Sequence, residues 1–429
     1  MSNIKSVAVL GSGTMGAGIA ALAADRDCKV LLLDIDKDTV EKGKMKIVNE
    51  KKPMLSKPSN IENIATGTFE KDFHKISDYD WICEAVVEKI EIKRKIFNEI
   101  ENYMNKSSLV SSNTSGIPLK DITKGMHEDF LKSVCITHFF NPVKIMKLCE
   151  LIPGEKTSKE VIQKLSIFLK DTLEKGVVYG KDTVNFIGNR IGCFFMFKGL
   201  HEGKNARKNN ISIEKMDALL SKPIGLPPTG LYGLIDLIGL DVMYSVGKNL
   251  EFNLPKNDLG RDFVSLPDEE LNLYNKGQLG RKTGGGFYRI NRTIEDQKLK
   301  EVYDLEDNIW KPALRENFNV SYDVMLKDTI EGQFVWNVMG ASLLYAADLI
   351  PEIADDIVNI DNAMKWGFAW EKGPFEILDI LVPEKVVEKC KNLRVKVPKM
   401  LEILSNSKNK FFYKEKNEFL NIHGEYQKI

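Results

Sequence analysis

Short apolar runs alternate with longer stretches of helical spacing over the first 182 residues. The runs Val7–Leu10 and Val30–Leu33 are bounded by turn residues, which is typical of buried strands. Between them, Ala17–Ala24 predicts a helix of small residues. Strands that alternate with helices predict a mostly parallel, doubly wound α/β sheet. Further strands are predicted at 81–87, 109–111, 133–139 and 147–152, and further helices at 88–104 and 161–174.

Beyond residue 182 the apolar positions follow helical spacing, which predicts an all-α C-terminal region. Two parts of it are similar, because Gly230 and Gly373 each precede an aspartate, Asp236 and Asp379, by six residues. We therefore expect two related helical units. They would pack as a pseudo-dimer within a monomer, and a homodimer is the alternative. Helices are predicted at 186–203, 213–220, 234–250 and 333–349, and domains at 1–182, 183–290 and 321–429, with a charged linker at 291–320.

The turn after the first strand has a nucleotide-binding pattern. Gly11 permits a tight turn, Gly13 lets the backbone approach a pyrophosphate, and Gly16 allows close packing of helix and strand. The diphosphate would lie at the helix N-terminus. Asp34, at the end of the second strand, is placed to bind both ribose hydroxyls and would repel a 2′-phosphate. The sequence predicts a Rossmann-type domain that binds NAD through Gly11, Ser12, Gly13, Thr14, Met15, Gly16 and Asp34.

Composition excludes several classes of partner. Of 429 residues, 43% are hydrophobic and 28% are charged, as in ordinary globular proteins. Lysine and arginine (61) balance aspartate and glutamate (61), so neither nucleic acid nor an anionic membrane is expected as a partner. No apolar run reaches membrane-spanning length, and the first strand begins too early for a signal peptide. Six scattered cysteines without metal-ligand spacing favour reduced thiols, no metal site and a cytoplasmic protein.

One of the five histidines is a candidate general base. Histidine suits that role because its pKa lies near neutral pH. His138 ends a predicted strand at the edge where doubly wound folds bind ligands. From the residues alone, a buried core histidine explains this position equally well. The other four histidines lie in polar, charged stretches typical of a protein surface: His74, His127, His201 and His423.

Seven motifs, in order, resemble those of the 3-hydroxyacyl-CoA dehydrogenases. The second helical unit resembles the extra C-terminal copy of longer members, some of which are fused to an enoyl-CoA hydratase. No hydratase segment is present in this sequence. The resemblance implies an acyl-CoA substrate, and it implies a hydratase as a fused or separate partner. The motifs are at residues 11–20, 84–88, 112–115, 138–142, 146–150, 185–190 and 282–288.

The resemblance implies reversible NAD-dependent oxidation of (3S)-3-hydroxyacyl-CoA to 3-oxoacyl-CoA, in fatty-acid β-oxidation or short-chain acyl-CoA metabolism. It implies that His138 is the base and that Glu150 stabilises its imidazolium. Ser112 and Asn189 would position the substrate, and Lys57 would meet a CoA phosphate. Further cofactor contacts are implied for Glu88, Lys93, Ser115, Asn141 and Lys282.

Two other functions remain open from the sequence. A β-hydroxyacid dehydrogenase acting on a free acid shares the glycine-rich start, but typically uses a lysine where this chain has His138 and Glu150. A non-catalytic NAD-binding scaffold would keep the fold without turnover. The segment between Ser112 and His138 is longer than in compact members, and the predicted helix after Asn189 contains weak helix formers. The preferred acyl length therefore stays open.

Overall fold

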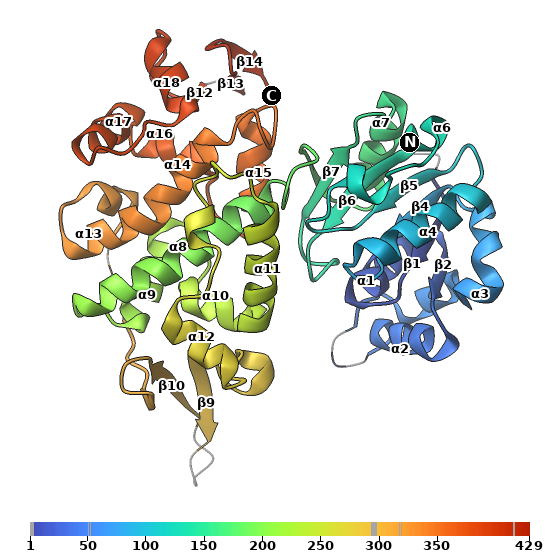
Figure 1. Ribbon diagram of the computed structural model, residues 1–429, viewed down its shortest axis with the longest axis horizontal. Helices are drawn as coiled ribbons and strands as arrows, with labels where there is room; N and C mark the ends of the chain where they lie inside the picture. Colours follow the sequence, from blue (N-terminus) through green and yellow to red (C-terminus); the bar gives the residue numbers. More distant parts are fainter. Residues whose placement is uncertain are drawn as a thin grey trace. The chain divides into compact units, whose positions relative to one another are not determined.

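The computed structural model describes residues 4–49, 51, 53–292, 298–316, 318, 320–414 and 417–429. The chain forms two compact units (Figure 1). The first comprises residues 1–187 and 352–355, and the second comprises residues 188–351 and 356–429. Both predicted helical units therefore belong to one compact body.

An eight-stranded sheet organises the first unit, in the order β3-β2-β1-β4-β5-β6-β7-β8. All neighbours pair in parallel except β6 and β7, which are antiparallel, so the predicted doubly wound sheet is confirmed. The edge strands β3 and β8 were not predicted. The strands are β1 (Ser6–Leu10), β2 (Lys29–Asp34), β3 (Ile64–Thr68), β4 (Trp81–Glu84), β5 (Leu109–Ser112), β6 (Val134–Phe139), β7 (Leu148–Pro153) and β8 (Gly176–Tyr179).

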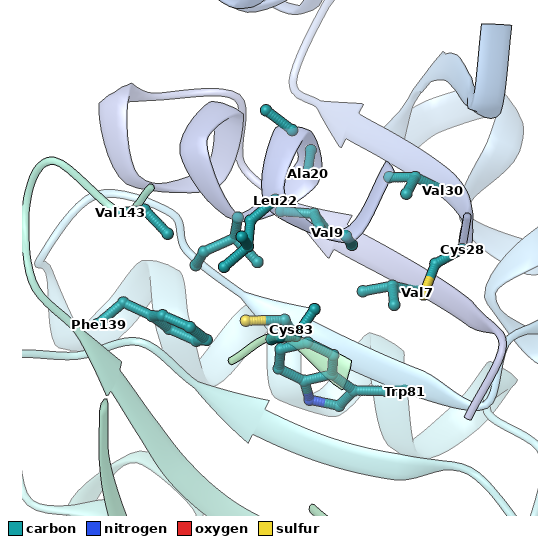
Figure 2. Packing of buried hydrophobic residues seen from close by; sticks show 14 of the residues in the cluster. Val7, Val9, Ala20, Leu22, Cys28, Val30, Trp81, Cys83, Phe139 and Val143 are labelled. Carbon is teal, nitrogen blue, oxygen red and sulfur yellow. The ribbon is translucent and has the colours of Figure 1, made fainter. Parts of the chain in front are cut away.

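Alternate residues of each strand enter two separate cores, one on each face of the sheet. Val7 and Val9 pack in one core with α1, α2 and α7, whereas Ala8 and Leu10 pack in the other with α4, α5 and α6. Figure 2 shows the first core, where Trp81 of β4 lies near Phe139. Burial on both faces explains the continuous apolar runs in the sequence. The helices are α1 (Thr14–Ala24), α2 (Lys37–Ile47), α3 (Phe69–Asp72), α4 (Ile90–Tyr103), α5 (Leu119–Ile122), α6 (Glu128–Leu131) and α7 (Lys159–Ile167).

The second unit is mainly helical. The single helix predicted at 234–250 is wrong, because Gly239 adopts φ 103° and separates α10 from α11 with an 89° bend. Among the described residues, no single helix is long and apolar enough to cross a membrane. The bent pair of α10 and α11 has the required length and apolar content only when the two helices are taken together. The helices are α8 (Gly188–Lys208), α9 (Ile213–Leu219), α10 (Gly230–Ile238), α11 (Leu240–Asn253), α12 (Asp268–Asn275), α13 (Ile330–Val335), α14 (Ala341–Asp348), α15 (Ile357–Gly367), α16 (Pro374–Ile380), α17 (Pro383–Asn392) and α18 (Lys399–Asn406).

Two small antiparallel sheets add to the expected all-α region. The predicted linker 291–320 contains strands, in which Glu301, Val302 and Tyr303 are buried while residues 298–300 are exposed. Residues 293–297, 317 and 319 of that linker lie outside the described residues. The strands are β9 (Tyr288–Arg292), β10 (Lys298–Asp304) and β11 (Ile309–Pro312) in one sheet, and β12 (Tyr413–Lys414), β13 (Glu418–Leu420) and β14 (Tyr426–Lys428) in the other.

The two helical halves repeat the same buried hydrogen bonds. Asp217 accepts hydrogen bonds from two main-chain N–H groups near the start of α10. It also accepts a hydrogen bond from the hydroxyl of Tyr288 at 2.9 Å. Asp361 accepts equivalent bonds from α16 and from the hydroxyl of Tyr413 at 2.7 Å. Burial raises the pKa of both carboxyls to about 7. The repeated arrangement supports an internal duplication.

A second aspartate in each half repeats in the same way. Asp236 accepts from the main-chain N–H groups of residues 287 and 288, and Asp379 from those of residues 412 and 413. Each aspartate therefore holds the strand that follows its own set of helices. The glycine and aspartate pattern seen in the sequence thus corresponds to one structural unit used twice.

A buried ionic network joins the two halves. Arg190 donates from Nε to the Tyr345 hydroxyl at 2.6 Å, and its guanidinium pairs with Asp258. The Tyr345 hydroxyl also lies 2.9 Å from Asp258, and its ring stacks on Phe194 with centroids 4.2 Å apart. Because Tyr345 comes from the second half, its hydroxyl connects that half to the start of α8.

Tyr345→Phe is expected to destabilise the helical unit by about 1–3 kcal/mol, because it removes a hydroxyl shared by two buried charged groups. Urea unfolding measures the loss. Tyr303→Phe is the control, since the Tyr303 hydroxyl makes only 3.4 Å contacts. Equal stability of Tyr345→Phe and the wild type would show that the network does not hold the halves together.

Glu270 should make stability depend on pH. It is fully buried, its carboxylate oxygens have no hydrogen-bond partner among the described residues, and Arg207 lies 3.8 Å away. Burial raises the pKa of Glu270 from 4.5 to about 7. The folded state therefore binds the proton of the Glu270 carboxyl more tightly than the unfolded chain does. The stabilisation that this protonation provides is fully present below pH 4.5 and is lost as the pH rises through 7.

Glu270→Gln is expected to reduce the stability difference between pH 5 and pH 8 by roughly 2–3 kcal/mol, since glutamine does not ionise. Urea unfolding of both proteins at the two pH values measures this change. The exposed Glu160→Gln serves as the control. An identical pH dependence in Glu270→Gln and the wild type would contradict the assignment.

Candidate active site

The glycine-rich turn has the shape that a dinucleotide pyrophosphate requires. A Cβ atom at Gly16 would lie 1.8 Å from the carbonyl oxygen of Gly11, so this approach of helix to strand excludes any side chain. A Cβ atom at Gly13 would meet nothing within 4 Å. No side chain caps the N-terminus of α1. Open space beside an uncapped helix N-terminus therefore fits a bound diphosphate.

Asp34 is tied to the same turn. Its Oδ2 accepts hydrogen bonds from the main-chain N–H and the hydroxyl of Ser12, both at 2.6 Å. Its Oδ1 accepts from the N–H of Ile35 at 2.7 Å. The carboxylate is partly exposed at the carboxyl end of β2, where the ribose contact was predicted. These bonds fix the carboxylate relative to the phosphate-binding turn, and the ribose contact stays a prediction.

His138 and Glu150 form a buried pair on neighbouring strands. They face each other directly in the antiparallel register of β6 and β7. The distance from His138 Nδ1 to Glu150 Oε2 is 2.6 Å. His138 is 3% exposed and Glu150 is fully buried. With Nδ1 donating to the carboxylate, Nε2 is the nitrogen that can accept a proton.

Further contacts hold this pair in place. Glu150 Oε1 accepts from the main-chain N–H of Ile187 at 3.1 Å. The His138 ring contacts Phe140 and Phe186, with centroid distances of 4.6 Å and 5.6 Å. Both the tautomer and the orientation of the imidazole are therefore fixed, as a general base requires.

Ser112 ends β5 on the same face of the sheet as His138. It pairs in register with Ile136, which is two residues before His138 on β6. Ser112 is fully buried, and its hydroxyl donates to Glu84 Oε2 at 2.5 Å. The structure thus brings Ser112, His138 and Glu150 to one face near the carboxyl ends of the parallel strands, where such sheets bind ligands.

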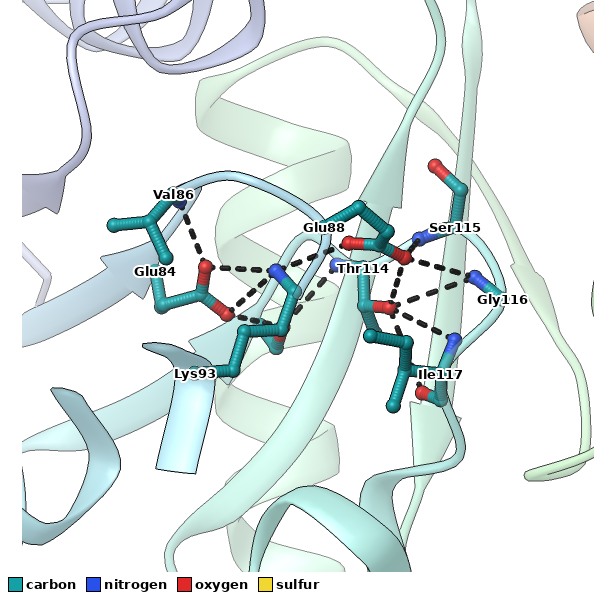
Figure 3. Close-up of polar contacts among 9 residues, drawn as sticks. Glu84, Val86, Glu88, Lys93, Thr114, Ser115, Gly116 and Ile117 are labelled. Atoms are coloured by element: carbon teal, nitrogen blue, oxygen red, sulfur yellow. Dashed lines mark hydrogen bonds and ion pairs between the residues drawn. The ribbon is translucent and has the colours of Figure 1, made fainter. Parts of the chain in front are cut away.

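Glu88 and Lys93 also belong to this edge of the sheet (Figure 3). Glu88 accepts from the hydroxyl of Thr114 at 2.6 Å and from the N–H of Ser115 at 2.9 Å. Burial would raise the pKa of Glu88, but Lys93 and these hydrogen bonds outweigh burial and lower it. Lys93 is 1% exposed and pairs with Glu84 and Glu88. Its predicted cofactor contact stays a prediction.

The remaining predicted residues lie elsewhere. Asn141 follows β6 and is exposed, and Lys57 is exposed. Asn189 and Lys282 belong to the second unit. Asn189 lies half-buried in the first turn of α8, whereas Lys282 is exposed and pairs with Asp241 at 2.5 Å.

Sequence reasoning missed one buried residue of this cluster. Glu84 pairs in register with Ser112 and accepts a hydrogen bond from its hydroxyl. The sequence had indicated Glu84 only as part of the motif at residues 84–88. A carboxylate at the end of an apolar strand is costly to bury alone, so its position could have signalled a polar partner.

Comparison with known proteins supports the same fold. The family model of the 3-hydroxyacyl-CoA dehydrogenase NAD-binding domain matches residues 6–183, and that of the C-terminal domain matches residues 186–290. A Rickettsia felis protein named as a trifunctional enzyme of the fatty acid oxidation complex is 36% identical over 413 residues. That match covers 93% of this chain and 57% of the relative, so the chain spans little more than half of that protein.

Two further proteins match. The mitochondrial hydroxyacyl-coenzyme A dehydrogenase of Rattus norvegicus is 33% identical over 300 residues, covering 67% of this chain and 91% of the relative. The crystal structure of 3-hydroxybutyryl-CoA dehydrogenase from Escherichia coli has a TM-score of 0.69 at 21% identity, covering 93% of this chain and 98% of that one. At this identity the structural match supports the fold.

The Rossmann-type sheet, the glycine-rich turn and the matched family model define a protein with a Rossmann-type NAD-binding domain. Within that class, the chain belongs to the 3-hydroxyacyl-CoA dehydrogenase family.

Proposed function

We propose that this chain catalyses the reversible NAD-dependent oxidation of (3S)-3-hydroxyacyl-CoA to 3-oxoacyl-CoA. The observation that carries the proposal is the buried pair of His138 and Glu150, joined at 2.6 Å. A histidine held in one tautomer by a carboxylate can accept the proton of a secondary alcohol. When bound, NAD supplies the hydride acceptor.

Each residue of the site has a defined task in this reaction. His138 takes the hydroxyl proton at Nε2, and the carboxylate of Glu150 stabilises the imidazolium that results. Ser112 positions the substrate oxygen, and Asn189 contributes to holding the substrate. Glu88, Ser115, Asn141 and Lys282 contact the cofactor, and Lys57 meets a CoA phosphate.

The metabolic setting is part of the proposal. Fatty-acid β-oxidation or short-chain acyl-CoA metabolism would use this reaction, with an enoyl-CoA hydratase as a fused or separate partner. The name of the Rickettsia felis relative supports that setting. A cytoplasmic location is supported by the six cysteines, all of which are buried and unpaired by disulfides.

The discriminating experiment compares acetoacetyl-CoA with free acetoacetate as oxidants of NADH. We expect NADH loss with the thioester and at least about 100-fold lower kcat/KM with the free acid, because the CoA contacts would be missing. Equal kcat/KM values would indicate a β-hydroxyacid dehydrogenase. Tight NADH binding without turnover of any acyl-CoA would indicate a non-catalytic scaffold.

A further inference from the structure

The motif at residues 185–190 begins with a turn that has no task in the reaction described above. Its first two residues, Asn185 and Phe186, adopt φ 60° and 50°. Among the residues that the structure describes, no other two consecutive non-glycine residues both have positive φ. The left-handed region crowds the Cβ atom, so asparagine tolerates it better than a bulky residue does. Backbone strain of this kind is concentrated at functional sites, where the surrounding structure holds it.

Two consecutive residues of this turn contact the buried histidine–glutamate pair. The ring of Phe186 packs on the ring of His138, with centroids 5.6 Å apart. The next main-chain N–H, that of Ile187, donates to Glu150 Oε1 at 3.1 Å. Phe186 is fully buried in one core of the sheet, and Asn185 is 5% exposed, so packing encloses the turn. The turn therefore reaches the histidine through a side chain and the glutamate through the main chain.

The left-handed conformation determines where this N–H points. Rotation about the N–Cα bond of Phe186 moves the peptide group that carries the N–H of Ile187. If the φ of Phe186 changed from 50° to the common value of about −60°, that peptide group would turn by roughly 110°. A hydrogen bond weakens steeply once the angle at the hydrogen falls below about 120°. The bond to Glu150 therefore depends on the left-handed conformation of the turn.

We propose that Asn185 and Phe186 are positioning residues for the proton-accepting pair. Their left-handed conformation aims the N–H of Ile187 at Glu150. It also places the ring of Phe186 against His138. This inference rests on the proposed function, and the two residues act through the pair without transferring a proton themselves. Misplacing a reacting group by about 1 Å can cost a factor of 10² in rate, so the turn should affect turnover more than cofactor binding.

Substitution of Asn185 in the full chain tests this inference. The kcat for acetoacetyl-CoA reduction by NADH and the Kd for NADH are measured for each protein. Valine is β-branched and opposes positive φ, so Asn185→Val should lower kcat by about 10–100-fold while the Kd for NADH changes less than about threefold. Asn185→Gly should retain kcat within about threefold, because glycine adopts positive φ without steric cost. An equal loss in Asn185→Gly would overturn the inference, since the effect would then come from the amide side chain.

Asn210→Val is the matched control. Asn210 also has φ 60°, but it follows the C-terminus of α8, at the opposite end of that helix from Asn189. Its substitution should lower stability in urea without lowering kcat. If Asn185→Val likewise lowered stability and left kcat unchanged, the turn would have a structural role alone, and the inference would be overturned.

The effect of Asn185→Val should also depend on His138, because the turn acts through the pair. In the His138→Gln background, Asn185→Val is expected to lower kcat by less than about threefold further. The same fold-loss in both backgrounds would overturn the inference, as would loss of NADH binding in parallel with turnover.

A second variant covers the case in which Asn185→Val does not fold. Alanine opposes the left-handed region less than a β-branched residue does, so Asn185→Ala is expected to lower kcat by about 3–10-fold. An unchanged kcat in Asn185→Ala would overturn the inference. Absence of turnover in the wild type would instead contradict the proposed function, so the two failures are distinguishable.

Discussion

Glu150→Gln is expected to lower kcat for acyl-CoA turnover by about 10³- to 10⁴-fold and to leave NADH binding intact. In other enzymes with a histidine–carboxylate pair, replacing the carboxylate by an amide has an effect of this size. The amide oxygen would keep the bond from the N–H of Ile187, so its NH₂ group would face His138 Nδ1. The imidazole would then carry its proton on Nε2, where the base must accept one.

Steady-state kinetics with acetoacetyl-CoA and NADH measures this loss, and fluorescence titration measures NADH binding. Glu101→Gln is the matched control, because Glu101 also lies beside a histidine nitrogen, His127 Nδ1, at 3.1 Å. That histidine is exposed and lies outside the site. A Glu150→Gln protein with more than a tenth of wild-type kcat would contradict the assigned role of the pair.

Asp34→Ala is expected to weaken NADH binding by about 100-fold and to leave NADPH binding undiminished. Hydrogen bonds to a charged group contribute about 1.5–3 kcal/mol each, and the predicted ribose contacts use this carboxylate. A 2′-phosphate would no longer face a negative charge.

The ratio of Kd values for NADPH and NADH measures this change in cofactor preference. Asp36→Ala is the control: Asp36 caps α2 by accepting from the N–H of Thr39 at 2.7 Å. Its loss should cost about 1 kcal/mol of stability without changing cofactor preference. A Kd ratio that is unchanged in Asp34→Ala would exclude the ribose contact.

Much of the first unit could be predicted because its sheet is buried on both faces. Residues such as Val7 and Ala8 enter opposite cores, so the central strands appear as continuous apolar runs. The edge strand β3 gave no such signal, since only Ile64 of its five residues is buried. In the second unit, the apolar pattern continues through Gly239, and only the positive φ of that residue reveals the bend.

The sequence indicated which residues form the candidate site, but it did not indicate how they are arranged. The motifs supplied His138, Glu150 and Ser112, but the direction of β7 is not encoded in an apolar pattern. Only the antiparallel register shows that His138 and Glu150 face each other. Glu84 was missed because its partners, Ser112 and Lys93, are distant in sequence and meet only in the folded sheet.

The most direct test of the proposed mechanism is the rate of NADH oxidation by acetoacetyl-CoA in the wild type and in His138→Gln, with NADH affinity measured in both. We predict turnover by the wild type, a loss of at least about 100-fold in His138→Gln, and equal NADH affinity. Equal turnover in the two proteins would show that His138 is not the proton acceptor, and would contradict the central claim.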